Sequence, residues 1–457
     1  MKQISCTKLA AMAGGTLLGK SQGVSITSIT IDSRSAKPGA LFIALPGALQ
    51  DGHDFVCNAF EHGASCAMIA TKHAHRIKAK TEELRRPLIV VDDPLKALQL
   101  MAQRHVESHA SVKRVGVTGS CGKTTTKEMI ASILSQLGKT AKTPGNLNSE
   151  IGLPISLFEI ESDTQYGVFE MGVDHVGEMD RMLDLWSPEA AVITNIGISH
   201  VGKMGSVQVI AKEKSKLFHP SISAPFIAEH STWAPYIGKI RGVDPIPFGL
   251  SSTRGIQNVE FLGLQGWKIT YQDTPIYLRA VGRHNLMNAL AAISVAQVFH
   301  ARPEDIAEGF ERFISIPGRS RIIDGPVTVI EDYYNSSVDS TATILDYMGS
   351  LPWDGRKRAV LGSMKELGFS SELAHQQVAH KLLSCGIEDI YLYGKEMESA
   401  WKEIRSLGAH AHVFFTDDYD ALQKKMLEET RKGDLVLVKG SRAMAMERLV
   451  PAISSIA

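Results

Sequence analysis

The stretch Val115-Gly-Val-Thr-Gly-Ser-Cys-Gly-Lys-Thr-Thr-Thr126 constrains the fold of this chain more than any other. The apolar run 114–117 predicts a buried strand, and the apolar spacing from Met129 to Leu137 predicts a helix. A glycine-rich turn between strand and helix offers backbone N–H groups and a helix N-terminus to an anion. Lys123 adds a positive charge, and the Thr124 hydroxyl can ligate Mg²⁺. We therefore predict a nucleoside triphosphate site.

The glycine spacing of this stretch departs from the common phosphate-binding loop. That loop has a glycine five residues before the glycine that precedes its lysine. Counting back from Gly122, this chain has Val117 at that place, and its other glycines stand at 116 and 119. The alternative is a chance glycine turn, but the flanking strand and helix favour the nucleotide site.

Length and composition bound the class of protein. A chain of 457 residues with 44% hydrophobic content can form about three domains, each with its own core. Basic and acidic residues both number 49, so no net charge favours nucleic acid or an acidic membrane. The apolar runs are too short for a signal peptide or a membrane span. The five cysteines form no C-x-x-C pair, so we expect reduced thiols in a cytoplasmic protein.

Alternating strand and helix patterns predict an α/β fold of three domains. Asp93-Pro94 has the form of a helix start, which puts the first boundary near residue 93, and Pro317-Gly318 marks the second. We expect a small α/β N-terminal domain over 1–93 and a central P-loop domain with a mostly parallel sheet over 94–316. The C-terminal domain, 317–457, is expected to be Rossmann-like, although it lacks a G-x-G-x-x-G.

Apolar runs bounded by turn residues predict the strands of these domains. The expected strands are Ser25–Ile31, Ala40–Leu45, Cys66–Ala70, Leu88–Val91, Tyr166–Met171, Ala191–Ile196, Pro225–Ala228, Trp267–Tyr271, Ile276–Ala280, Thr328–Ile330, Ala359–Leu361, Ile390–Tyr393, His412–Phe415 and Leu435–Val438. The expected helices, besides the one after the glycine loop, are Phe55–His62, 94–105, 207–218, 282–299, Leu373–Leu383 and Tyr419–Thr430. Little helix is expected between 225 and 281.

Polar residues follow several of these strands. Glu170 ends one central strand and His200 follows another, so both could join Lys123 and Thr124 in one phosphate–metal site beyond the carboxyl ends of the sheet. In the N-terminal domain, Asp32-Ser-Arg34 could bind a phosphate or ribose, but a turn with a surface ion pair is favoured.

Lys214 falls in the middle of the apolar face of the helix over 207–218. A buried ammonium is unfavourable unless it is paired, neutral or chemically modified. The alternative is a buried stem with its tip in water, and the residues alone do not decide between the two. Asn285, in the first turn of its helix, is placed to cap that helix or to bind a ligand.

These motifs, in this order, resemble the Mur ligases, ATP-dependent amide ligases that build the peptide of the bacterial cell wall. The resemblance spans nearly the whole chain and accounts for the unusual glycine spacing. It implies ATP contacts at Gly119, Ser120, Cys121, Gly122, Lys123, Thr124, Thr125, Asn285, Arg319 and Asp332. It also implies two Mg²⁺ sites, a carbamylated Lys214, and catalytic roles for Lys123, His200 and Lys214. The implied metal ligands are Thr124, Glu170, His200 and Lys214.

Further motifs point to the members that join D-alanyl-D-alanine to a UDP-N-acetylmuramoyl-tripeptide. These motifs are Ile31-Asp-Ser-Arg34, Gly145-Asn-Leu-Asn148, Leu361-Gly-Ser-Met-Lys-Glu-Leu-Gly368 and Lys439-Gly-Ser-Arg442. The implied substrate contacts are Asp32, Ser33, Arg34, Asn146, Asn148 and Asn335. Ser149 and Ser337 depart from the family pattern. The rivals are a sibling ligase that adds the third amino acid, a folate polyglutamylating synthetase, and a P-loop regulatory ATPase. We expect a monomer that binds no nucleic acid and does not insert into a membrane.

Overall fold

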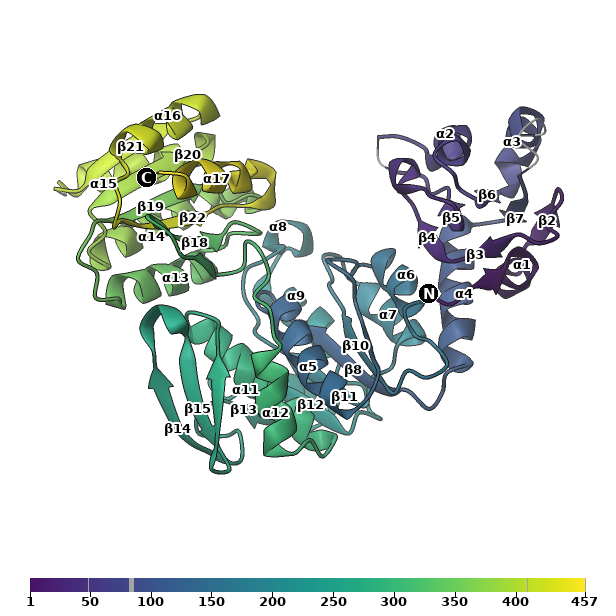
Figure 1. Cartoon of the computed structure of the whole chain (residues 1–457), viewed down its shortest axis with the longest axis horizontal. Helices are drawn as coiled ribbons and strands as arrows, with labels where there is room; N and C mark the ends of the chain where they lie inside the picture. The colour runs from purple at the N-terminus through teal and green to yellow at the C-terminus, as the bar shows by residue number, and fades with distance from the viewer. Residues whose placement is uncertain (48, 82–85, 409, 457) are drawn as a thin grey trace. The chain divides into compact units, whose positions relative to one another are not determined.

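The computed structural model describes residues 1–47, 49–81, 86–408 and 410–456. These residues form an α/β protein whose larger sheets are mostly parallel, as predicted (Figure 1). They make up two compact units, residues 1–116, 138–173 and 177–189 in the first and 117–137, 174–176 and 190–457 in the second. Within the described ranges, no helix has both the length and the apolar character needed to cross a membrane.

The N-terminal part of the first unit is built on a five-stranded sheet. In spatial order its strands are β2 (Thr16–Leu18), β7 (Leu88–Val91), β6 (Cys66–Ala70), β5 (Ala40–Ile43) and β4 (Ser28–Thr30). Strands β4 to β7 run parallel, and β2 is antiparallel to β7. The accompanying helices are α1 (Cys6–Ala13), α2 (Val56–Glu61), α3 (Ala74–Thr81) and α4 (Pro94–Glu107). The predicted start of α4 is confirmed, because the Asp93 side chain accepts hydrogen bonds from Leu95 N and Lys96 N.

The single strand predicted over Ser25–Ile31 is wrong in one respect. The segment forms two strands, β3 (Ser25–Ile26) and β4, which belong to different sheets. β3 pairs with β1 (Ile4–Ser5), whereas β4 pairs with β5. Between them the N–H of Thr27 bonds to Gly39 O. The continuous strand-like pattern of Ser25–Ile31 does not reveal where the chain changes its partner strand.

The central sheet has six strands. Their spatial order is β13 (Ile246–Phe248), β12 (Ala224–Ala228), β11 (Ala190–Ile193), β8 (Lys113–Thr118), β10 (Tyr166–Glu170) and β9 (Thr140–Lys142). The pairs β11–β12, β12–β13 and β9–β10 are parallel. The helices of this region are α5 (Lys123–Leu137), α6 (Gly152–Leu157), α7 (Glu178–Leu185), α8 (Val201–Met204), α9 (Val207–Ser215), α10 (Ala234–Arg241), α11 (Arg283–Val298) and α12 (Pro303–Glu311). α5 packs against α11 and α12.

The expectation of little helix between 225 and 281 missed α10. Ile237 is its one buried residue, so its apolar periodicity is weak. The rest of that segment holds an antiparallel sheet of β14 (Ile256–Phe261), β15 (Trp267–Tyr271) and β16 (Thr274–Leu278).

The C-terminal part is a six-stranded α/β sheet, in agreement with the Rossmann-like prediction. Its order is β17 (Arg321–Ile323), β18 (Thr328–Asp332), β22 (Leu435–Lys439), β19 (Lys357–Gly362), β20 (Asp389–Tyr393) and β21 (His412–Thr416). All neighbouring pairs are parallel except β17–β18. Its helices are α13 (Val338–Ser350), α14 (Ser371–Ser384), α15 (Glu398–Ser406), α16 (Tyr419–Glu429) and α17 (Leu449–Ser454).

Both faces of this sheet are buried. Val329 and Val360 pack into one apolar cluster, whereas their neighbours Ile330 and Leu361 pack into another. Burial on both faces explains why these strands read as continuous apolar runs in the sequence.

Candidate nucleotide and metal site

The glycine loop connects β8 to α5, as predicted, and two of its glycines cannot be replaced without strain. Gly119 has a φ of 147° and Gly122 a φ of 80°. A Cβ on Gly119 would lie 1.9 Å from Thr194 Oγ1, and one on Gly122 would lie 2.6 Å from Asn288 Oδ1. The glycines at these positions therefore set the loop shape, and Val117 belongs to the strand before it.

Two residues that follow β11 hold this loop, and neither was predicted from the sequence. Asn195 Oδ1 accepts hydrogen bonds from Ser120 N at 3.0 Å and Cys121 N at 2.8 Å. Thr194 Oγ1 donates to Cys121 O at 2.5 Å. The available signal was the run of polar residues at the end of the predicted strand 191–196.

Lys123 is the first residue of α5. Its ammonium donates to Gly119 O at 2.9 Å and Ser120 O at 3.4 Å, so the charge lies against the glycine loop. Thr124 and Thr125 follow in the first turn of the helix and are buried. The loop, the helix N-terminus and the ammonium lie together as expected from the sequence, and the binding of an anion there stays a prediction.

His200 and Lys214 belong to the same unit as Lys123. His200 has a φ of 64° at the start of α8, and its Nδ1 lies 3.2 Å from Glu366 Oε2. Burial lowers the pKa of His200, and the positive charge of Lys123 lowers it further. A lowered pKa keeps the imidazole neutral near pH 7, which is the form that binds a metal ion.

Lys214 is buried within α9. The residue is 1% exposed, whereas Lys212 on the same helix is exposed. The alternative of a buried stem with its tip in water is therefore wrong.

Glu170 ends β10 in the first unit. It is buried, and its Oε1 accepts a hydrogen bond from Asn148 Nδ2 at 2.6 Å. Asn148 O also accepts from Gly172 N at 2.8 Å, whereas Asn146 is exposed. Because Glu170 lies in a different unit from Thr124, their joint metal site stays a prediction.

The remaining predicted nucleotide contacts lie in the second unit. Asn285 does not cap its helix: its Nδ2 donates to Val281 O at 2.8 Å and its Oδ1 accepts from Asn288 at 3.1 Å. The Arg319 guanidinium lies over the Tyr334 ring, 3.9 Å from its centroid. These residues come from α11 and from the segment between the central and C-terminal parts.

Asp332, at the end of β18, bridges two parts of the C-terminal region. Its Oδ1 accepts from Ser320 N and Ser320 Oγ at 3.0 Å each, and its Oδ2 accepts from Lys439 Nζ at 2.6 Å. The buried Lys439 also donates to Asn335 O at 3.1 Å. The departure at Ser337 has a structural role, because its Oγ accepts from Ser340 N at 3.3 Å and caps α13.

In the N-terminal sheet, the segment Asp32-Ser-Arg34 forms the turn that the sequence favoured. The Asp32 carboxylate bonds to the Arg34 guanidinium at 2.8 and 2.9 Å, with both side chains exposed, and Ser33 is buried. The hydrogen bond from Arg34 lowers the pKa of Asp32. An exposed ion pair of this kind is available to a ligand, so the role in substrate binding stays a prediction.

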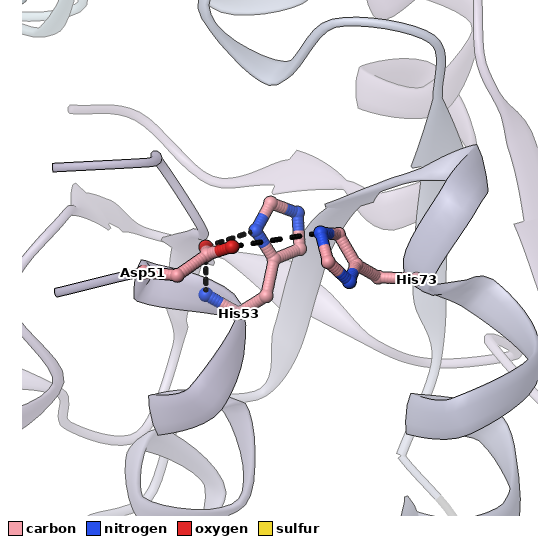
Figure 2. A group of neighbouring side chains, drawn as sticks. All are labelled: Asp51, His53 and His73. Carbon is pink, nitrogen blue, oxygen red and sulfur yellow. Dashed lines mark hydrogen bonds and ion pairs between the residues drawn. The ribbon is translucent and has the colours of Figure 1, made fainter.

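Asp51, His53 and His73 lie together near the carboxyl ends of β5 and β6 (Figure 2). Ala70 N donates to His53 Nε2 at 2.9 Å, so the ring proton is on Nδ1, which donates to Asp51 Oδ1 at 2.6 Å. A histidine binds a metal through an unprotonated nitrogen, and neither nitrogen of His53 is free to do so. We therefore assign this group to holding the loop after β5, not to a metal.

Comparisons with known proteins agree with this layout. Residues 25–106 match the model of the "Mur ligase family, catalytic domain", 117–296 the "Mur ligase middle domain" and 318–442 the "Mur ligase, glutamate ligase domain". The chain is 35% identical to the UDP-N-acetylmuramoyl-tripeptide–D-alanyl-D-alanine ligase of Treponema pallidum over 451 residues, which cover 97% of each chain. The chain belongs to the Mur ligase family.

Solved structures of family members share the fold of this Mur ligase. MurF from Acinetobacter baumannii matches with a TM-score of 0.85 and 28% identity over 99% of both chains. MurF from Thermotoga maritima, solved in complex with ADP, matches with a TM-score of 0.76 and 25% identity over 93% of this chain and 97% of that one. The three-domain α/β architecture is thus shared along the whole length.

Proposed function

We propose that this Mur ligase joins D-alanyl-D-alanine to a UDP-N-acetylmuramoyl-tripeptide with the use of ATP. The observation that carries this proposal is the 35% identity to a ligase of that name over 97% of both chains. Because the likeness covers all three parts of the chain, it includes the parts expected to bind the UDP-sugar, ATP and the incoming dipeptide.

The reaction activates a carboxylate. The γ-phosphoryl group of ATP passes to the C-terminal carboxylate of the tripeptide, which yields an acyl phosphate and ADP. The amine of D-alanyl-D-alanine attacks the acyl carbon, and phosphate leaves from the tetrahedral intermediate as the amide forms. Positioning of two anions and neutralisation of their charge supply most of the catalysis.

The residues of the second unit fit the nucleotide side of this reaction. Lys123, which lies against the loop carbonyls at 2.9 and 3.4 Å, would turn toward a phosphate held by the loop. Asn285, Arg319 and Asp332 contact the nucleotide, and closure about Arg319 excludes the water that would hydrolyse the acyl phosphate.

Two metal-binding groups complete the site. Thr124 and Glu170 would hold one Mg²⁺, and the neutral His200 and a carbamylated Lys214 would hold the second; both ions would neutralise phosphate and carboxylate oxygens. The support for carbamylation is the burial of Lys214, which is 1% exposed. A carbamate replaces a buried cation by an anion that can bind a metal.

We place the domain boundaries near residues 93 and 316. Asp93 caps α4, and Gly318, with a φ of 74°, turns the chain before the C-terminal sheet. Asp32, Ser33, Arg34, Asn146, Asn148 and Asn335 contact the substrates. The enzyme acts as a monomer in the cytoplasm, where ATP and the UDP-sugar are available.

A phosphate-release assay with each amine in turn tests the proposal. We expect release only when ATP, the UDP-tripeptide and D-alanyl-D-alanine are all present, because the acyl phosphate turns over by amine attack. Glutamate with a folate substrate, and diaminopimelate or lysine with the UDP-dipeptide, should give only background. Release that needs the UDP-dipeptide or the folate instead would assign the chain to the corresponding ligase. Release without any amine would indicate a regulatory ATPase.

A further inference from the structure

Two cysteines that are far apart in the sequence lie in contact in the N-terminal sheet. Cys6 Sγ and Cys66 Sγ are 3.0 Å apart, although 60 residues separate them in the chain. Both thiols are free, and both residues are fully buried. No C-x-x-C spacing marks this pair.

Regular structure holds each cysteine in place. Cys6 is the first residue of α1, and its N–H donates to Val24 O at 3.1 Å. Cys66 is the first residue of β6 and pairs in register with Leu41 of β5. A disulfide has a sulfur–sulfur bond of about 2.0 Å, so closing this pair needs an approach of only about 1 Å.

We propose that Cys6 and Cys66 are a modification site at which a hydroperoxide such as hydrogen peroxide forms an intramolecular disulfide. The Cys6 thiolate attacks one peroxide oxygen, which gives a sulfenic acid and hydroxide, and the proton from Cys6 converts the hydroxide to water. The Cys66 sulfur then attacks the Cys6 sulfur. The Cys66 proton leaves with the displaced hydroxyl as a second water. Two thiols are oxidised and one peroxide is reduced, so the step balances.

The electrostatics of the pair agree with this order of events. The hydrogen bond between the two sulfur atoms lowers the pKa of Cys6, whereas burial raises the pKa of Cys66. The thiolate is the reactive form of cysteine. Cys6 is therefore the attacking residue, and Cys66 keeps its proton until the second step.

The position of Cys6 and Cys66 in the sheet predicts how a disulfide between them would affect stability and activity. Cys66 stands at the amino end of β6, whereas Asp32 follows the carboxyl end of β4 and His73 follows that of β6. The disulfide would tie α1 to the sheet at the amino ends of its parallel strands, opposite the carboxyl end that Asp32 follows. We expect the oxidised protein to resist thermal unfolding better, with ligase activity unchanged.

The test uses the full-length protein treated with dilute hydrogen peroxide, then denatured and alkylated before thiol counting and peptide mapping. Two of the five thiols should be lost, a peptide linking Cys6 to Cys66 should appear, and dithiothreitol should reverse both changes and the rise in unfolding temperature. Cys6→Ala and Cys66→Ala should each prevent the paired loss.

Cys57→Ala and Cys385→Ala are matched controls, because both cysteines are only half-buried and more open to peroxide. These variants should still form the linked peptide. The proposal would be overturned if the wild-type protein forms no linked peptide, if oxidation stops at sulfinic acid on Cys6, or if the lost thiols are those of Cys57, Cys121 or Cys385. The wild-type peptide map decides the matter even if the Cys66→Ala protein does not fold.

Discussion

Lys123→Ala is expected to remove nearly all ADP formation. The side chain places an ammonium directly against the phosphate-binding loop, at 2.9 Å from Gly119 O. Loss of a preorganised group that stabilises developing negative charge lowers the rate by about 10²- to 10³-fold. The measurement is ADP production with saturating UDP-tripeptide and D-alanyl-D-alanine.

The control for this change is Lys432→Ala, which removes an exposed lysine from a turn of the C-terminal part. It should leave the rate unchanged. Unfolding curves of both variants should match the wild type, because Lys123 lies at a helix start and its main chain is unaltered. ADP production by Lys123→Ala within a few-fold of the wild type would contradict the assignment of the loop.

Lys214→Ala is expected to lower the ligase activity about as much as Lys123→Ala does, by roughly 10²- to 10³-fold. The substitution removes the anionic group that would face the second metal. Short carboxylates such as formate or acetate should restore part of the activity by occupying the space of the lost carbamate. The measurement is the rate of the variant against carboxylate concentration.

Lys212→Ala serves as the matched control, since Lys212 lies on the same helix but is exposed. It should be fully active and insensitive to added carboxylate. In the wild type, ¹³C-labelled bicarbonate should give a carbamate signal that is missing from Lys214→Ala. Wild-type activity in Lys214→Ala without added carboxylate would exclude the carbamate role.

Local features of the site could be predicted from the sequence, because the residues that make them are adjacent in the chain. The strand, loop and helix from Lys113 to Leu137 follow from apolar spacing and glycine placement alone. The position of Lys214 on the apolar face of its helix follows from the period of a helix. The choice between a buried and a snorkelling side chain needed the neighbouring elements, which sequence spacing does not describe.

Contacts between distant segments could not be predicted. Asn195 binds the loop from 75 residues away, and Lys439 binds Asp332 from 107 residues away. Neither pair leaves a periodic pattern in the sequence. The division of Ser25–Ile31 between two sheets was missed for the same reason, because strand pairing is decided by partners elsewhere in the chain.

Transfer of ¹⁸O from the tripeptide carboxylate to phosphate shows whether the reaction passes through an acyl phosphate. The tripeptide carboxylate is labelled with ¹⁸O, and the phosphate released during ligation is analysed by mass spectrometry. An acyl-phosphate ligase predicts one ¹⁸O atom in the phosphate, because the carboxylate oxygen that takes the phosphoryl group leaves with it. If unlabelled phosphate forms in the same amount as the amide product, water and not the carboxylate accepts the phosphoryl group. That result would contradict the acyl-phosphate mechanism.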